Sequence, residues 1–207
     1  MCANYEAVAA ETLRKRGYST VRAPAAERSE VYPGQVGPVI TSMNPEAVQY
    51  GCFGLVPHWA KPTLARMTYN ARSETVASKP SFRSAWRNSQ LAVIPIMSFF
   101  EPNYETGRPV RWRIRRTDGQ PFGLAGIWER HLDDPGPTAW SFSMLTINAD
   151  GHSLMSRFHA PDDEKRSVVV LDDEDWVRWL HATSEADRRA MLRPMESESM
   201  TAEPAPK

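Results

Sequence analysis

The 207-residue sequence predicts an α+β protein: a compact, β-rich single domain of mixed or antiparallel strands with peripheral helices. This length suits one domain with a real core, or one domain with a tail. Seven Trp and 17 Pro favour a loop-rich, strand-containing fold over a helical bundle. Several short segments also alternate apolar and polar residues, as half-buried strands do. We expect the domain to occupy residues 1–193 and a disordered tail, polar and without periodicity, to occupy residues 194–207.

The N-terminal half predicts two short helices and three strands. An amphipathic pattern that ends at Gly17 predicts the first helix, and the stretch between this helix and the first strand is rich in Pro, Ala and charge, which indicates a loop. The expected helices cover 5–16 and 80–88, the loop covers 20–37, and the expected strands cover 39–41, 48–55 and 91–100.

Residues 109–117 give the clearest strand signal. Arg111, Arg113 and Arg115 fall on one face of the alternation, and Trp112 and Ile114 fall on the other. The pattern therefore predicts a strand with a basic outer face.

The C-terminal half continues with strands and ends with helices. Asp118-Gly119 is typical of a hairpin turn, and Asp172 and Ser184 are good helix N-caps. The expected strands cover 121–128, 139–148 and 166–171, and the expected helices run from 172 to 180 and from 184 to 192.

Charge is balanced overall but unevenly distributed. Lys and Arg exceed Asp and Glu by seven in residues 61–130, and the reverse holds in residues 131–207. A basic middle segment with interleaved aromatics suits a polyanion such as DNA, although segment charge alone does not define a surface patch. No apolar run approaches a membrane span, the N-terminus lacks a signal-peptide layout, and two cysteines suit a reducing compartment. We expect a cytoplasmic protein without membrane contact.

The second residue is the first candidate for chemistry. Removal of Met1 would leave Cys2 with a free α-amine and a thiol on adjacent carbons. Such an aminothiol condenses with an aldehyde to an imine and then closes to a five-membered thiazolidine. Both groups are partly deprotonated near neutral pH. The alternative is that a cysteine stands there without a chemical role.

Three further places carry chemically useful side chains. The segment 70–75 holds Asn70, Arg72 and Glu74, and it is either a solvated turn or a site wall. Glu101 follows an apolar strand, where desolvation favours the protonated form that a general acid needs, unless the side chain faces solvent. His159 lies in a loop, where it is either a proton carrier or an ordinary surface histidine.

Several enzyme classes lack their signatures. The five histidines show no metal-binding spacing, and there is no CxxC, P-loop, GxGxxG or GxSxG motif. We expect no cofactor and no metal.

Taken in order, these segments resemble the SRAP family, the SOS response-associated peptidase domain proteins. The matching features are Met1-Cys2, the Asn-Ala-Arg-x-Glu-Thr run at 70–75, Phe-Phe-Glu at 99–101 and a late His before an apolar strand. Supporting matches lie at 53–59, 82–85 and 118–128, so the resemblance covers nearly the whole chain to about residue 190. No single motif is decisive, but the ordered set is specific.

The resemblance implies a SRAP-like fold and a cross-linking activity. Family members remove Met1 and form a thiazolidine between Cys2 and the ring-opened sugar of an abasic site in single-stranded DNA. Carried over, Asn70 orients the Cys2 amine and the sugar, Glu101 acts as general acid and base, and His159 assists proton transfer. Arg72 and Arg83 correspond to phosphate-contacting arginines, Trp59 lies in a loop beside the DNA, and the strand bearing Arg111 and Arg113 agrees with a basic groove.

The sequence departs from the family pattern at three places. Ala3-Asn4 replaces the common Gly-Arg, Pro102 replaces the usual Trp, and about five extra residues follow His159. The third departure leaves His152 as an alternative to His159 for the catalytic histidine.

The resulting hypothesis is a DNA-damage protein that forms a covalent cross-link to abasic single-stranded DNA, with monomer as the expected state and association with the nucleoid after damage. Two alternatives stay open: a thiol peptidase that cleaves proteins beyond Met1 removal, and a non-covalent single-stranded DNA-binding module.

Overall fold

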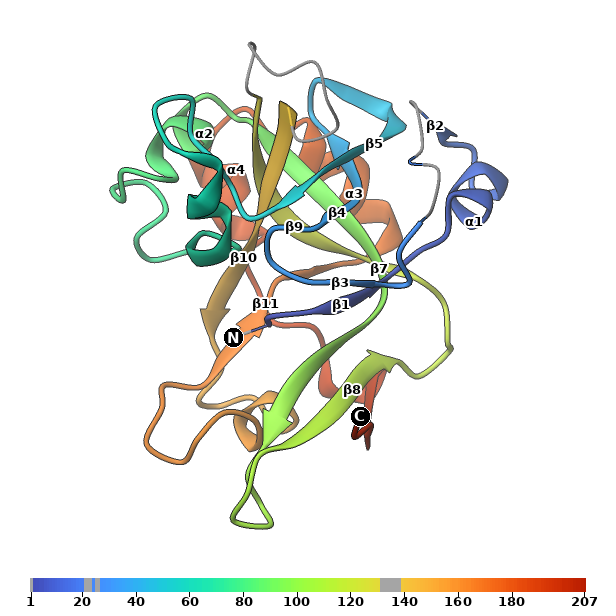
Figure 1. The fold of residues 1–207 in the computed structure, drawn as a ribbon, viewed down its shortest axis with the longest axis vertical. Coiled ribbons are helices and arrows are strands. Elements are labelled where there is room, and N and C mark those ends of the chain that lie inside the picture. Colours follow the sequence, from blue (N-terminus) through green and yellow to red (C-terminus); the bar gives the residue numbers. More distant parts are fainter. Residues whose placement is uncertain (1, 21–23, 25–26, 131–138) are drawn as a thin grey trace.

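The computed structural model describes residues 2–20, 24, 27–130 and 139–207. Strands form one large sheet, and short helices lie at its edges (Figure 1). The predicted α+β class, with mixed strand directions and peripheral helices, is confirmed. Most strand pairs are antiparallel, and β10 pairs in parallel with β5 and β6.

The elements follow one another along the chain in this order. The N-terminal strands are β1 (Tyr5–Ala7), β2 (Ser19–Thr20), β3 (Glu30–Val31), β4 (Val36–Thr41), β5 (Asn44–Phe53) and β6 (Asn70–Arg72). The later strands are β7 (Leu91–Asn103), β8 (Val110–Arg116), β9 (Phe122–Arg130), β10 (Trp140–Asn148), β11 (Arg166–Val168), β12 (Val170–Leu171) and β13 (Met200–Pro204). The helices are α1 (Ala10–Lys15), α2 (Arg83–Arg87), α3 (Asp173–Leu180) and α4 (Glu185–Ala190), with 3-10 turns η1 (Pro62–Met67), η3 (Met155–Arg157) and η4 (Ser197–Ser199).

Five strands pair in a closed ring. β7 pairs with β9, β9 with β10, β10 with β5, β5 with β4, and β4 again with β7. Alternate residues of a strand point to opposite faces. In β7, Leu91 and Val93 accordingly join the hydrophobic core that α2 and α3 cover, whereas Ala92 and Ile94 join a second core that contains Cys2. β7 thus contributes to both cores.

The N-terminal segment differs from the predicted helix over residues 5–16. Residues 5–7 are extended as β1 because they pair with both β7 and β3. The helix α1 begins only at Ala10, whose backbone N–H donates to the Glu27 carboxylate at 3.2 Å. This pairing places Cys2, just before β1, beside the end of β7.

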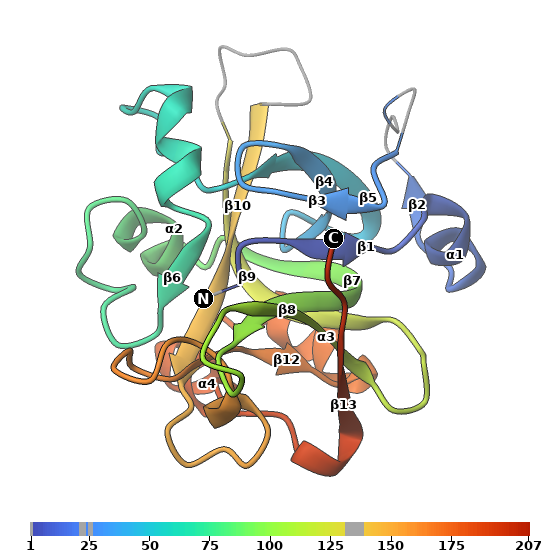
Figure 2. The ribbon, with the colours of Figure 1, turned by 60° about the horizontal axis from the view of Figure 1, so that its bottom comes forward.

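The predicted disordered tail is wrong for residues 197–204. They form η4 and β13, and β13 pairs antiparallel with β8 along its free edge (Figure 2). The segment lacks apolar periodicity, so its order comes mainly from backbone pairing with an exposed strand edge. Met200 is nevertheless buried in the second core.

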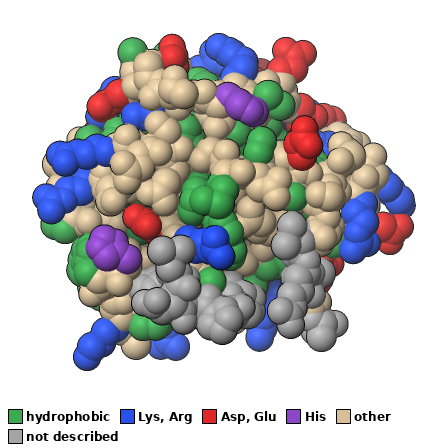
Figure 3. All heavy atoms as spheres, turned by 90° about the horizontal axis from the view of Figure 1, so that it is seen from above, with side chains coloured by type: hydrophobic (Ala, Val, Ile, Leu, Met, Phe, Trp, Pro, Cys, Tyr) green, Lys and Arg blue, Asp and Glu red, His purple; other side chains and the backbone are tan. Residues whose placement is uncertain are grey.

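Among the described residues, the face at the top of the molecule as drawn in Figure 1 has no single-sign patch of charge. Basic and acidic side chains are both scattered over this face, mostly toward its edge (Figure 3). The four candidate catalytic residues from the sequence instead meet near the start of β1 and the end of β7.

Candidate active site at the N-terminal cysteine

Cys2 is held in place before β1 by its neighbours. Its side chain is fully buried, and its thiol donates to the carbonyl of Asn4 at 3.3 Å. That carbonyl also accepts from the backbone N–H of Phe100 at 3.2 Å. The Asn4 carbonyl therefore links the Cys2 thiol, through two hydrogen bonds, to β7, the strand that carries Glu101.

Asn70 reaches Cys2 from a different part of the sheet. Strand β6 pairs in parallel with β10, with Asn70 opposite Met144. The Asn70 side-chain Nδ2 donates to the Cys2 carbonyl at 2.9 Å. Its Oδ1 is buried and has no hydrogen-bond partner among the described residues. A buried amide oxygen in this state is an acceptor available to an incoming donor.

Glu101 and His159 form a buried pair at the end of β7. The carboxylate Oε2 lies 3.1 Å from the His159 Nε2, and both side chains are less than a tenth exposed. At this distance the carboxylate and the imidazole are in direct contact. A carboxylate in contact with an imidazole can exchange protons with it and with a bound substrate.

The backbone places His159 in an unusual conformation. Its φ is +68°, a left-handed value that is uncommon for a residue other than glycine. Its N–H donates to the Pro102 carbonyl at 2.9 Å, and the Lys165 ammonium donates to the carbonyl of Ala160 at 2.6 Å. Such strain costs on the order of 1–3 kcal/mol and is concentrated at functional sites.

Electrostatic coupling connects Cys2 with the carboxylate. Burial raises the pKa of the Cys2 thiol far above its usual range, and the negative charge of Glu101 raises it further. Burial and then the charge of Cys2 also raise the pKa of Tyr5. At neutral pH the thiol is therefore protonated, so it needs a base to become a nucleophile.

These four residues, Cys2, Asn70, Glu101 and His159, are called the Cys2 cluster below. The four predicted catalytic side chains come from well-separated parts of the chain and meet in one place. His159 contacts Glu101, whereas the hydrogen bonds of the His152 side chain within the described residues lie elsewhere. The His152 Nε2 lies 2.8 Å from the Met195 carbonyl, and its Nδ1 accepts from the N–H groups of Leu154 and Met155.

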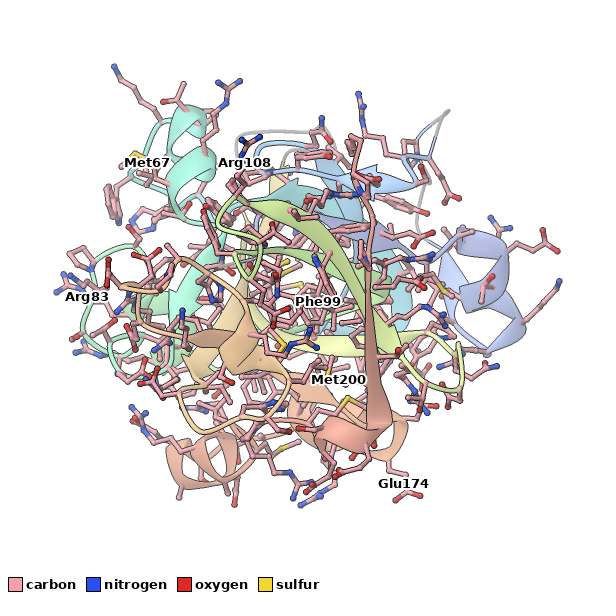
Figure 4. All side chains as sticks on the ribbon, turned by 90° about the horizontal axis from the view of Figure 1, so that it is seen from below. Met67, Arg83, Phe99, Arg108, Glu174 and Met200 are labelled. Atoms are coloured by element: carbon pink, nitrogen blue, oxygen red, sulfur yellow. The ribbon has the colours of Figure 1, made fainter. Side chains whose placement is uncertain are left out.

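The predicted DNA-contacting residues divide into two groups. Arg72 follows Asn70 on the same face of β6, and its guanidinium pairs with Glu164. Arg83 starts α2 and projects from the molecule, and the side chain of Met67 lies on the same flank (Figure 4). Trp59 is 58% exposed. These residues are accessible to a ligand.

Arg111 and Arg113 belong to the second group. In β8, Trp112 stands opposite Glu101, whereas Arg113 stands opposite Phe100 and Arg111 opposite Pro102. Residues that stand opposite each other share a face, so both arginines lie on the face away from Glu101. Arg113 pairs with Glu6, and Arg111 pairs with Glu30 at 2.9 Å and stacks over Phe100.

An ion-pair network that the sequence patterns did not predict lies behind Arg72. Arg166 is 2% exposed, binds both carboxylate oxygens of Glu74 and donates to the Thr146 carbonyl. It also contacts Glu164, the partner of Arg72. The acidic and basic run 162–166 was the available signal, but sequence cannot show which of its charges is buried.

No helix in the described part of the chain is long and apolar enough to cross a membrane. The same residues include no group of three or more His, Cys, Asp or Glu side chains placed to hold a metal ion.

The whole chain, residues 1–207, matches the sequence model of a family described as SOS response associated peptidase (SRAP). The abasic site processing protein YoqW of Bacillus subtilis strain 168 is 29% identical over 154 residues, which cover 72% of this chain and 65% of YoqW. The abasic site processing protein YobE of the same organism is 30% identical over 154 residues, with 72% and 67% coverage.

Solved structures resemble the whole chain. A crystal structure of a Bordetella bronchiseptica protein has a TM-score of 0.87 and 32% identity, covering 99% of both chains. A Bacteroides thetaiotaomicron protein has a TM-score of 0.82 and 28% identity, covering 97% of this chain and 90% of that one.

Proposed function

The chain belongs to the SOS response associated peptidase family, and we propose that it processes abasic sites in single-stranded DNA by a covalent cross-link through Cys2. The cross-link follows removal of Met1, which frees the α-amine of Cys2. The observation that carries the proposal is the meeting of Cys2 with Asn70, Glu101 and His159. The relatives YoqW and YobE, named as abasic site processing proteins, support the same substrate.

The chemistry begins with the ring-opened aldehyde of the abasic sugar. The α-amine of Cys2 attacks the aldehyde carbon, and loss of one water gives an imine. The thiol sulfur then adds to the imine carbon while the nitrogen takes up a proton, which closes the thiazolidine. Because the thiol is protonated at neutral pH, the addition needs a base for the thiol proton.

Each residue of the cluster has a part in these steps. Glu101 raises the pKa of the thiol and is the base that accepts its proton. His159, 3.1 Å away, exchanges protons with Glu101 and supplies one to the departing water. Asn70 holds the Cys2 carbonyl, and its Oδ1, which no described residue hydrogen-bonds, accepts from the amine or from a sugar hydroxyl.

In this proposal, residues around the Cys2 cluster bind the single-stranded DNA. Arg72 and Arg83 contact phosphates, and Trp59 offers a stacking surface for a base. Arg111 and Arg113 are engaged with carboxylates on the other face, so their predicted DNA contacts require those ion pairs to open. The protein acts as a monomer in the cytoplasm, at damaged DNA of the nucleoid.

Intact mass spectrometry tests the proposal. The purified protein should lack one methionine, and incubation with an abasic single-stranded oligonucleotide should add the oligonucleotide mass minus one water. Cys2→Ala keeps an α-amine, so it should form only an imine that borohydride traps, whereas the wild-type adduct should persist without borohydride.

The matched control is the same oligonucleotide without the lesion, which should leave the protein mass unchanged. A retained Met1, or a borohydride-independent adduct on Cys2→Ala, would contradict the proposal. A retained Met1 with peptide cleavage would instead favour a thiol peptidase.

A further inference from the structure

The ion pair between Arg72 and Glu164 lies at the rim of the Cys2 cluster. Arg72 Nη1 is 2.8 Å from Glu164 Oε2, and the two side chains are 48% and 37% exposed. Arg72 is two residues beyond Asn70, about 7 Å along the strand. Glu164 stands five residues after His159 in the same loop. An anion is thus already placed on an arginine that shares the strand β6 with Asn70.

Other side chains hold Glu164 from behind, whereas among the described residues the Arg72 guanidinium has only this ion pair. Glu164 Oε1 receives Arg166 Nη1 at 2.8 Å and Asn148 Nδ2 at 3.3 Å. Arg166 is itself buried and bound to Glu74 and Thr146. Among the described residues, Glu164 is the carboxylate within ion-pair distance of Arg72. The carboxylate is therefore the anchored partner and the arginine is the movable one.

Arg166 above all, and Arg72 as well, keep the pKa of Glu164 below its usual range, so the carboxylate is charged at neutral pH. A guanidinium binds a carboxylate and a phosphate in the same geometry. Asp162 and Asp163 add further negative charge to the loop whose Glu164 pairs with Arg72. A DNA strand that approaches Arg72 therefore finds this arginine already paired with the Glu164 carboxylate.

We propose that Glu164 is a built-in competitor for DNA phosphate, which occupies Arg72 in the free protein and yields it when a strand binds. The proposal rests on the proposed function, because it takes Arg72 as a phosphate contact. Its consequence is weak binding to intact strands. The protein leaves undamaged DNA readily, and the covalent bond at the lesion supplies the retention that the phosphate contacts do not.

The test is binding to an intact single-stranded oligonucleotide, measured by fluorescence anisotropy at several salt concentrations. Glu164→Gln should bind about three- to tenfold more tightly than wild type, since one exposed ion pair no longer opposes binding. The expected change is a gain, which a misfolded variant does not produce. In an Arg72→Ala background the same substitution should give no such gain.

Asp163→Asn is the matched control, because it removes the same charge from the same loop and Asp163 makes no ion pair within the described residues. An equal gain from Asp163→Asn would overturn the proposal in favour of general electrostatics. Weaker binding by Glu164→Gln would overturn it too, because Glu164 would then be orienting Arg72 for the phosphate. Absence of binding by every variant would have the same consequence.

A different measurement tests the proposed function. A wild-type protein that forms no adduct with the abasic oligonucleotide contradicts the cross-linking chemistry. The gain of Glu164→Gln on intact DNA is measured without any lesion, so the two failures are distinguishable.

Discussion

The Cys2 cluster and the arginines of β8 occupy the same region of sheet but differ in how their charges are satisfied. Arg111, Arg113 and Arg115, called the arginine stripe, each pair with a carboxylate, from Glu30, Glu6 and Glu203 respectively. The cluster instead buries a protonated thiol, a carboxylate against an imidazole, and an amide oxygen that has no hydrogen-bond partner in the described part of the chain. The charges of the stripe are paired on the sheet, whereas the cluster gathers titratable groups in a buried place.

This difference shows what a charged pattern in a strand can and cannot predict. The alternation in residues 109–117 correctly places the arginines on one face of β8. It does not reveal that neighbouring strands supply carboxylates to that face. Buried or half-buried charges are paired as a rule, so a basic stripe inside a sheet needs its partners identified before it is assigned to a ligand.

Among substitutions that distinguish the Cys2 cluster from the arginine stripe, we expect the largest change in adduct formation at Glu101. Glu101→Gln keeps the shape but removes the base for the thiol proton, so the rate of adduct formation should fall by about 10²-fold or more. The measurement is a time course of the covalent band on denaturing gels. Glu105→Gln is the control, since Glu105 lies on the loop after β7 and its exposed carboxylate pairs with Arg157 of η3. An unchanged rate in Glu101→Gln would show that another group takes the proton.

The second prediction concerns the pH dependence of the Cys2 thiol. Because burial and Glu101 raise its pKa, the thiolate fraction should still be increasing above the ordinary cysteine value of about 8.5. Alkylation of Cys2, followed by mass spectrometry of the N-terminal peptide, should therefore accelerate with pH beyond that value. Glu101→Gln should shift the profile toward lower pH. A plateau near pH 8.5 in the native protein would contradict the raised pKa.

The third prediction separates structure from chemistry at the C-terminal strand. Removal of residues 200–207 uncovers the edge of β8 and the buried Met200 site. It should lower the free energy of unfolding by about 1–3 kcal/mol, measured by urea denaturation. Removal of Ala205, Pro206 and Lys207 alone is the milder comparison. An unchanged stability after the longer deletion is what a disordered tail would give.

The smallest effects compare two arginines directly. Arg113→Ala removes the guanidinium that Glu6 and Ser98 share, although these two side chains still hydrogen-bond each other, so stability should fall by about 1 kcal/mol while DNA affinity stays the same. Arg72→Ala should weaken binding to single-stranded DNA by about fivefold with less effect on stability. Denaturation curves and anisotropy titrations measure the two quantities. Reversed results would make the arginine stripe the DNA-contacting surface.

Local patterns predicted much of the fold. The apolar run 91–100 indicated β7, which continues to Asn103, and the arginine alternation indicated β8. Residues 200–204 were missed because their order depends on an unpaired edge, which a sequence pattern does not display. Propensity likewise favoured a helix where β1 pairs with two other strands.

The candidate site was predicted through the order of motifs along the chain. That order named Cys2, Asn70, Glu101 and His159, and the structure brings them together. The partners of the arginines could not be predicted, because Glu6 and Arg113 are 107 residues apart in sequence. Which of several nearby carboxylates reaches an arginine depends on strand register, and register follows from the whole sheet.

The double burial of β7 has a consequence for how the molecule opens. Since β7 places Leu91 in one core and Ile94 in the other, neither core can loosen without loss of this strand from its neighbours. We expect the amides of β7 to exchange with solvent deuterium only when the whole molecule unfolds, and both cores to melt in one cooperative transition. Glu101 lies two residues before the end of β7 and should share in that protection. We therefore expect the local fluctuations that give a DNA strand access to the cluster to occur in the loop of His159.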